Sequence, residues 1–256
     1  MSVLSDVERF YRSYPYEKGQ IGKSFCGRPI FYFKVRKTAY PVVLLQYAIH
    51  AREFVTTYLS LMQIEDFIKN GEVGTAYFIP LLNPDGVKIA QTTNPLYKAN
   101  ARGVDLNVNF DARWGTGDKN VTKRGTENFI GEYPFSESET IALREFTYKV
   151  RPDATVSYHS KGEEIYFEFF QEQEKREKDF ILAKAVKDTT GYQIKSTVGS
   201  AGGYKDWCIE KLKIPALTIE VGDDRLSHPI KKECAKEIFE KNKGVVYVVI
   251  TSLLEL

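Results

Sequence analysis

The chain has 256 residues, of which 43% are hydrophobic and 27% charged, a balance that suits one large domain or two small ones and argues against disorder. Its 36 Lys and Arg against 34 Asp and Glu leave a net charge of only +2, too small a basic excess for a nucleic-acid-binding protein. No apolar run approaches the ~18 residues of a membrane span, and the first residues do not resemble a signal peptide, so we expect a cytoplasmic protein without a membrane partner.

The first half of the chain alternates predicted strands with helices. Strands are predicted, from alternation or from short apolar runs, at residues 28–35, 42–46 and 75–82. Apolar residues spaced three or four apart from 54 to 68 predict a helix, which Asn70-Gly71 ends. Residues 83–86, Asn-Pro-Asp-Gly, are a strong turn signal, and residues 91–133 are loop-like.

The second half continues the alternation. The capping box at 136–139 predicts the start of a helix, residues 172–188 predict a charged helix, and Pro229 fits the first turn of a final helix. Further strands are predicted at residues 154–158 and 214–221. No repeat or linker divides residues 1–256, so we expect a single α/β domain with helices packed on a central sheet.

Two of the three histidines directly follow predicted strands. His50 comes after the strand at 42–46 and is followed three residues later by Glu53, and His159 comes after the strand at 154–158. Two His and one Glu, with an open position for water, are a frequent ligand set of catalytic zinc. His-x-x-Glu alone also occurs as a pair without metal. The three cysteines are odd in number and widely spaced, which disfavours a disulfide framework or a Cys-type zinc site.

Glu220 is the other candidate for chemistry, because it lies between Ile219 and Val221 in an apolar strand. A carboxylate buried there is costly unless it is paired or neutral, and such positions are enriched in functional acids. The alternative is a Glu that faces solvent on an edge strand, and periodicity does not decide between the two. Residues 99–110 carry Arg and several Asn, but by composition they form only a polar loop.

Eight short motifs along the chain resemble, in the same order, those of the zinc carboxypeptidase family, the carboxypeptidase A-like metallopeptidases. The motifs are I-G-K-S-x-x-G-R-P-I at 21–30, H-A-R-E at 50–53, L-N-P-D-G at 82–86, R-G-V-D-L-N-x-N-F at 102–110, F-S-E-S-E-T at 135–140, S-Y-H-S at 157–160, G-G-Y-K-D-W at 202–207 and P-A-L-T-I-E-V-G at 215–222. The resemblance implies a central mixed β-sheet flanked by helices, and a zinc peptidase.

The resemblance also implies roles for single residues. His50, Glu53 and His159 would hold one Zn²⁺ per chain. Glu220 would act as general base, taking a proton from a zinc-bound water and passing it to the leaving amine. Arg102 is matched to the arginine that stabilises the oxyanion.

Substrate contacts are implied in the same way. Arg52 would line the groove beyond the scissile bond, and Asn107 matches the asparagine that helps to hold the terminal carboxylate of the substrate. Lys205 falls where the family sets specificity for the leaving side, which suggests a substrate with a negative group there. The alternative is that Lys205 points to solvent.

Two positions depart from the family pattern. The family places an Arg after Asn107, where it clamps the terminal carboxylate, but this chain has Val108. The substrate-capping Tyr of the family corresponds to Val198 here, and we consider Tyr204 as its replacement.

These departures, with the motifs at 98–107 and 202–207, are similar to a bacterial branch of γ-D-glutamyl-diaminopimelate peptidases and murein peptide amidases. We therefore expect a small peptide substrate that is cut between γ-D-Glu and meso-diaminopimelate. One alternative is a conventional carboxypeptidase that removes C-terminal, perhaps acidic, residues. Another is a peptide-binding protein that has lost catalysis. The sequence does not predict the oligomeric state.

Overall fold

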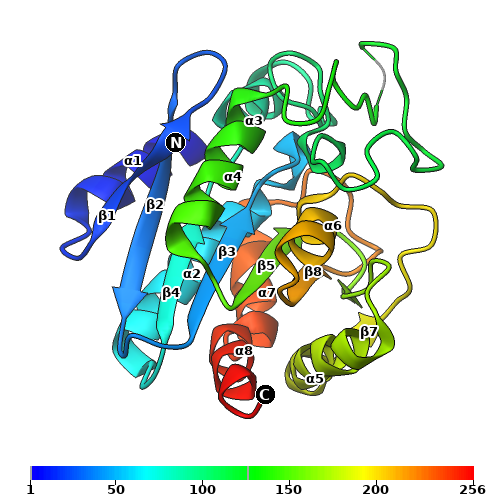
Figure 1. The fold of residues 1–256 in the computed structure, drawn as a ribbon. Coiled ribbons are helices and arrows are strands. Elements are labelled where there is room, and N and C mark those ends of the chain that lie inside the picture. The colour runs from blue at the N-terminus through cyan, green and yellow to red at the C-terminus, as the bar shows by residue number, and fades with distance from the viewer. Residues whose placement is uncertain (1, 126) are drawn as a thin grey trace.

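An eight-stranded mixed sheet forms the centre of the computed structural model, which describes residues 2–125 and 127–256 (Figure 1). The strand order is β1-β2-β4-β3-β5-β8-β6-β7. The four central strands β4, β3, β5 and β8 run parallel, and antiparallel pairings join them to β2 and β6. The strands are β1 (Lys18–Lys23), β2 (Pro29–Arg36), β3 (Val42–Tyr47), β4 (Thr75–Ile79), β5 (Ala154–His159), β6 (Glu164–Tyr166), β7 (Gln193–Ile194) and β8 (Ala216–Glu220).

Helices cover both faces of this sheet, which confirms the expected α/β fold. Helices α4 and α6 belong to one face, whereas α2, α5, α7 and α8 pack on the other (Figure 1). The helices are α1 (Val3–Ser13), α2 (Val55–Asn70), α3 (Pro84–Thr92), α4 (Ser138–Val150), α5 (Gln173–Thr190), α6 (Tyr204–Trp207), α7 (Ala235–Asn242) and α8 (Val245–Leu254). In the described part of the chain, no helix is both long and apolar enough to cross a membrane.

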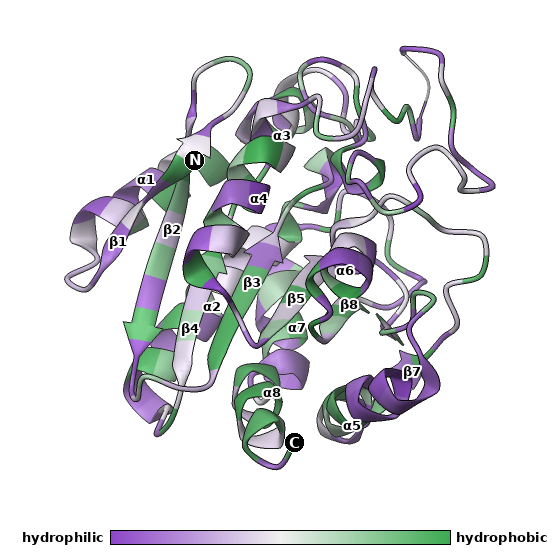
Figure 2. Ribbon diagram, in the orientation of Figure 1, coloured by the Kyte–Doolittle hydropathy of each residue, from purple (hydrophilic) through white to green (hydrophobic). Residues whose placement is uncertain are grey.

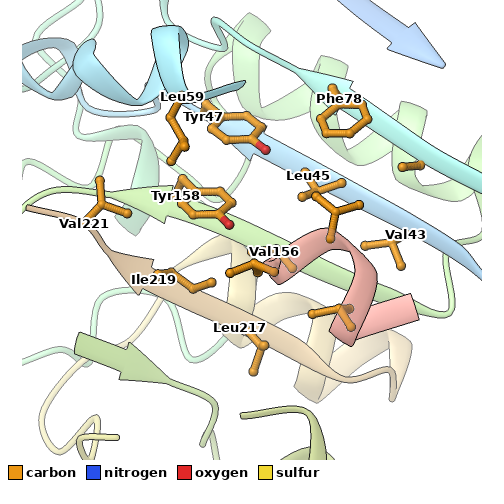
Figure 3. Packing of buried hydrophobic residues seen from close by; sticks show 14 of the residues in the cluster. Val43, Leu45, Tyr47, Leu59, Phe78, Val156, Tyr158, Leu217, Ile219 and Val221 are labelled. Carbon is orange, nitrogen blue, oxygen red and sulfur yellow. The ribbon is translucent and has the colours of Figure 1, made fainter. Parts of the chain in front are cut away.

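The central strands are largely apolar because both of their faces are buried. All six residues of β5 are buried, and Leu45, Val156 and Leu217 from three neighbouring strands meet on one face (Figure 3). Tyr47 and Tyr158 stack on that face with their ring centroids 4.8 Å apart. Figure 2 shows how a central strand differs from a helix on the outside of the sheet. Strand β3 is largely hydrophobic, whereas α5 is mostly hydrophilic, as expected for the predicted charged helix.

Several boundaries differ from the predictions. The Asn-Pro-Asp-Gly signal begins helix α3 instead of a plain turn, because the Asn83 side chain accepts from the Gly86 amide and Pro84 occupies the first turn. The expected capping box does not form, since α4 starts at Ser138 after Glu137, which makes no side-chain cap. The last helices begin only at Ala235, well after Pro229. Helices α1 and α6 and strands β1, β6 and β7 have no counterpart among the predicted elements.

Candidate metal centre and active site

The candidate site lies at the carboxyl ends of three adjacent parallel strands. His50 follows β3, His159 is the last residue of β5, and Glu220 is the last residue of β8. His159 and Glu220 are direct partners in the β5–β8 register. Strand ends and the loops after them are the usual location of functional side chains in such sheets.

A single turn of 3₁₀ helix, Ala51–Glu53, brings the Glu53 carboxylate back to His50. Glu53 Oε1 lies 2.9 Å from His50 Nδ1, and Glu53 Oε2 lies 3.1 Å from His159 Nδ1. The two Nδ1 atoms are themselves 3.1 Å apart. The three side chains are buried and each offers a ligand atom, all within 4.8 Å of one another, so His50, Glu53 and His159 could hold a metal ion.

The spacing and chemistry of these atoms fit zinc. Ligands at 2.0–2.1 Å in tetrahedral geometry are about 3.3 Å from each other, close to the 2.9–3.1 Å observed here. Asp105 Oδ1 lies 3.0 Å from His50 Nε2 and can accept a hydrogen bond from the Nε2–H group. In that tautomer the lone pair of His50 Nδ1 is available for a metal. A carboxylate behind a ligating imidazole is a recurrent feature of zinc sites.

The electrostatics of the cluster also suit a cation. Burial alone would lower the pKa of His50, but the nearby carboxylates of Glu53 and Asp105 outweigh it and raise this pKa to about 9. The pKa of Glu53 is held well below its usual range by His50 and His159, again against burial. Burial lowers the pKa of His159. Ligand groups of this kind lose their protons when a metal binds, so a bound zinc would take the place of a positive charge that the cluster already accommodates.

Glu220 faces a cavity of about 440 Å³ that also exposes His50 and Lys98. Among the described residues, none forms a hydrogen bond or ion pair with the Glu220 carboxylate, which is therefore free to act on a bound molecule. Burial, and then the charge of Glu53, raise the pKa of Glu220 well above its usual value. A carboxyl group with a raised pKa beside a metal site has the properties of a general base and acid.

Lys98, which sequence reasoning did not single out, supplies the cation next to this centre. Its Nζ lies 2.8 Å from Asp105 Oδ2 and donates to Asn128 Oδ1 at 2.8 Å. An ammonium has three N–H donors, so one remains for the cavity. Lys98 is the first residue of the motif at 98–107, and its position before a run of turn residues was the signal available in the sequence.

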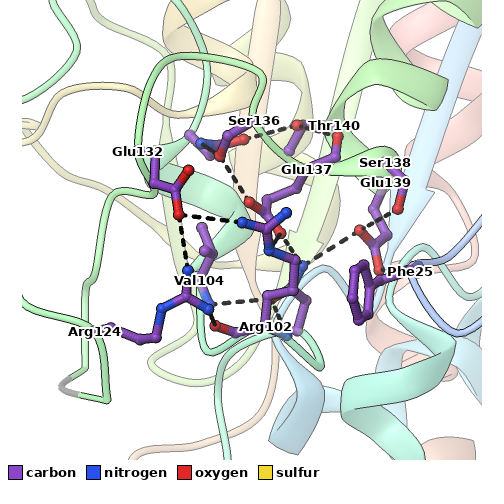
Figure 4. Close-up of polar contacts among 12 residues, drawn as sticks. Phe25, Arg102, Val104, Arg124, Glu132, Ser136, Glu137, Ser138, Glu139 and Thr140 are labelled. Atoms are coloured by element: carbon purple, nitrogen blue, oxygen red, sulfur yellow. Dashed lines mark hydrogen bonds and ion pairs between the residues drawn. The ribbon is translucent and has the colours of Figure 1, made fainter.

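Arg102 is not among the residues that line the cavity, so the geometry does not support the oxyanion role predicted for it. Its guanidinium lies 3.4 Å from Glu132 and 3.6 Å from Glu137, and its Cζ lies 5.6 Å from the centroid of the Phe25 ring (Figure 4). Arg102 does not line the cavity, whereas Lys98 does. Lys98 is therefore the cavity-lining cation that pairs with Asp105, the carboxylate in contact with His50.

The predicted substrate contacts are only partly brought together. Asn107 and Lys205 line the cavity, as do the departing positions Val108 and Val198. The charge of Lys205 is already neutralised, because its Nζ lies 2.6 Å from Asp206 and donates to the Glu168 carbonyl at 2.7 Å.

Tyr204 and Arg52 do not reach the cavity. Tyr204 is fully buried, its hydroxyl hydrogen-bonds with Thr147, and its ring packs near Trp207, so it cannot replace a substrate-capping tyrosine. Arg52 stands beside the metal ligands in the chain, but its guanidinium binds Glu127 at 2.8 Å.

Comparison with known proteins agrees with this site. The sequence profile described as zinc carboxypeptidase matches residues 5–239. Gamma-D-glutamyl-L-diamino acid endopeptidase 1 of Lysinibacillus sphaericus is 25% identical over 267 residues, covering 90% of this chain and 67% of that protein.

Two solved structures share the fold. Bovine thrombin-activatable fibrinolysis inhibitor, in complex with tick carboxypeptidase inhibitor, superposes with a TM-score of 0.87 at 21% identity, over 100% of this chain and 97% of that one. A murein-tripeptide amidase from Escherichia coli O157 superposes with a TM-score of 0.66 at 21% identity, over 94% of this chain and 93% of that one.

Proposed function

Because the chain belongs to the zinc carboxypeptidase family, and is thus a zinc metallopeptidase, we propose that it hydrolyses the amide bond between γ-D-Glu and a diamino acid in murein-derived peptides. The observation that carries the proposal is that the His50–Glu53–His159 cluster and the unpartnered carboxylate of Glu220 open onto one cavity. Two comparisons support the substrate: a relative that is a γ-D-glutamyl-diamino acid endopeptidase, and a murein-tripeptide amidase with the same fold.

The residues of the chain divide the chemistry between them. Zinc, when bound, lowers the pKa of water and polarises a carbonyl group. Glu220 takes a proton from the attacking water and delivers it to the leaving amine, for which its raised pKa is suited. The free N–H of Lys98 donates to the carbonyl oxygen as negative charge develops on it.

The missing arginine favours this substrate over ordinary C-terminal residues. Val108 follows Asn107 and lines the cavity, so no guanidinium is present at that position to clamp a terminal carboxylate in two hydrogen bonds. Lys205 is occupied by Asp206 and does not replace it. This chain therefore lacks the main anchor with which a conventional carboxypeptidase holds the C-terminal carboxylate of its substrate.

A cleavage panel tests the substrate. Zinc-loaded protein is incubated with L-Ala-γ-D-Glu-meso-diaminopimelate and with simple peptides that end in Glu, Lys or Leu, and the products are read by mass spectrometry. We expect release of diaminopimelate while the simple peptides stay intact. Trimming of the simple peptides instead would make the protein a conventional carboxypeptidase, and no cleavage of any peptide would favour a binding protein.

Lys98→Met is expected to lower kcat by about 10²–10³, the usual cost of removing one oxyanion donor. Zinc content is measured in parallel, because Lys98 also pairs with the Asp105 that orients His50. The matched control is Arg102→Met, which removes a cation outside the cavity and should change kcat by less than a few-fold. A large loss in Arg102→Met with little effect in Lys98→Met would return the oxyanion role to Arg102.

A further inference from the structure

We propose that Asp118 and Lys119 together recognise an amino group and a carboxylate carried on the same carbon at the distal end of the leaving residue. This inference rests on the proposed function, because it assigns a substrate group within the same cavity. Among diamino acids, this charge pair would favour those with a zwitterionic distal end, such as diaminopimelate, over those that end in an amine alone, such as lysine.

The charges that line the cavity point to this pair. Lys98 is neutralised by Asp105 at 2.8 Å, and Lys205 by Asp206 at 2.6 Å. Glu220 is required for the chemistry. The remaining charges that line the cavity are those of Asp118 and Lys119, one of each sign. Neither side chain forms an ion pair or hydrogen bond with another described residue.

The loop that carries this pair is held in place by backbone contacts. The Asp118 amide donates to the Gly199 carbonyl at 2.9 Å, and the Val121 amide donates to the Asn128 carbonyl at 3.1 Å. Gly199 has a φ of +78°, and a Cβ atom there would collide with the Asp118 carboxylate. The carboxylate therefore rests against a glycine of the opposite loop, at the boundary of the cavity.

Opposite charges on adjacent residues that line one cavity can discriminate between ligands. A lone carboxylate that approaches Lys119 also meets Asp118, and a lone ammonium that approaches Asp118 also meets Lys119, so each gains little. An amino-carboxylate carbon satisfies both charges at once. Asn120, the next residue, also lines the cavity.

The test uses four substrates, L-Ala-γ-D-Glu-X, with X as meso-diaminopimelate, L-lysine, L-2-aminopimelate or L-norleucine. Their distal ends carry both groups, the amine, the carboxylate or neither. With the zinc-loaded full chain, we expect kcat/KM for diaminopimelate to exceed that of each other substrate by about tenfold or more. Lys119→Met should reduce the diaminopimelate-to-lysine ratio to near one, and Asp118→Asn should do the same for the diaminopimelate-to-aminopimelate ratio.

Matched controls are Lys187→Met and Asp188→Asn on α5, which make the same charge changes outside the cavity and should keep both ratios. Binding of free diaminopimelate, measured by calorimetry, supplies a readout that does not need turnover. Cleavage of the diaminopimelate peptide with ratios unchanged in Lys119→Met and Asp118→Asn would overturn this inference and leave the proposed function standing.

Binding of free diaminopimelate without cleavage of its peptide would support the charge pair and contradict the proposed function. If no murein peptide is cleaved, yet free diaminopimelate binds the wild type and binds Lys119→Met at least tenfold more weakly, the charge pair is established and the proposed function fails. If diaminopimelate is neither released nor bound, both fail.

Discussion

Glu220→Gln is expected to retain zinc and to lose between about 10² and 10⁴ of the hydrolysis rate, the range attributed to a positioned general base. Glutamine preserves the size and most of the polarity of the side chain but cannot accept the proton of the attacking water. Because Glu220 is not one of the three clustered ligands, metal content should remain near one zinc per chain. The loss should fall on kcat more than on KM, since proton transfer is made only in the transition state.

The matched control for this change is Glu163→Gln. Glu163 immediately precedes β6, the strand next to β8, and its carboxylate pairs with Lys241 outside the cavity. Its substitution also removes one negative charge, so a comparable loss of rate in both variants would indicate a general electrostatic effect. Full activity in Glu220→Gln would exclude Glu220 as the general base.

The sheet and the metal cluster were predictable from the sequence for the same reason. Buried parallel strands are mostly apolar, and the runs at β3, β5 and β8 are short enough to be predicted as strands. The first polar groups after or at the end of such strands, His50, His159 and Glu220, then share one edge of the sheet. Glu220 lies at that edge and not on a solvent-facing edge strand, because β8 has neighbours on both sides.

The choice between Lys98 and Arg102 could not be made from the sequence, because a turn decides it. Asn100 Oδ1 accepts from the amides of Arg102 and Val104, and Gly103 adopts a φ of +76°. This turn reverses the chain between the two cations, so that only Lys98 stays on the side of the metal ligands. The buried partner Glu137, which lies 35 residues after Arg102 in the chain, then fixes Arg102 outside.

Lys205 and Tyr204 show a second limit of sequence reasoning. Both belong to the short helix α6, whose residues are all buried against the sheet. Tyr204 enters the aromatic cluster with Phe110 and Trp207, and Lys205 finds its counter-ion in the next residue, Asp206. A motif identifies which residues are present, whereas burial and pairing decide which charges stay available. The position of Asp118 depends in the same way on a distant segment, through its contact with Gly199.

His159→Gln is expected to abolish tight zinc binding and, with it, nearly all activity. His159 supplies one of only two imidazole ligands in the cluster, and a glutamine amide is a much weaker zinc ligand than an imidazole. Binding to the folded state alone stabilises the wild type, so zinc at about 100 times its Kd should raise Tm by roughly 5–10 °C. In His159→Gln this zinc-dependent rise should disappear, while unfolding without zinc stays cooperative, which separates ligand loss from misfolding.

His228→Ala is the matched control for His159→Gln, because it removes the only histidine of the chain that is not in the proposed ligand set. His228 is partly buried and lies outside the group of side chains that could hold a metal. Its variant should keep both the zinc content and the zinc-dependent rise in Tm. If His228→Ala lost zinc as completely as His159→Gln, the ligand set would have to include His228. If His159→Gln kept one zinc per chain, the ion would be held elsewhere, and the cavity beside Glu220 would no longer be its site.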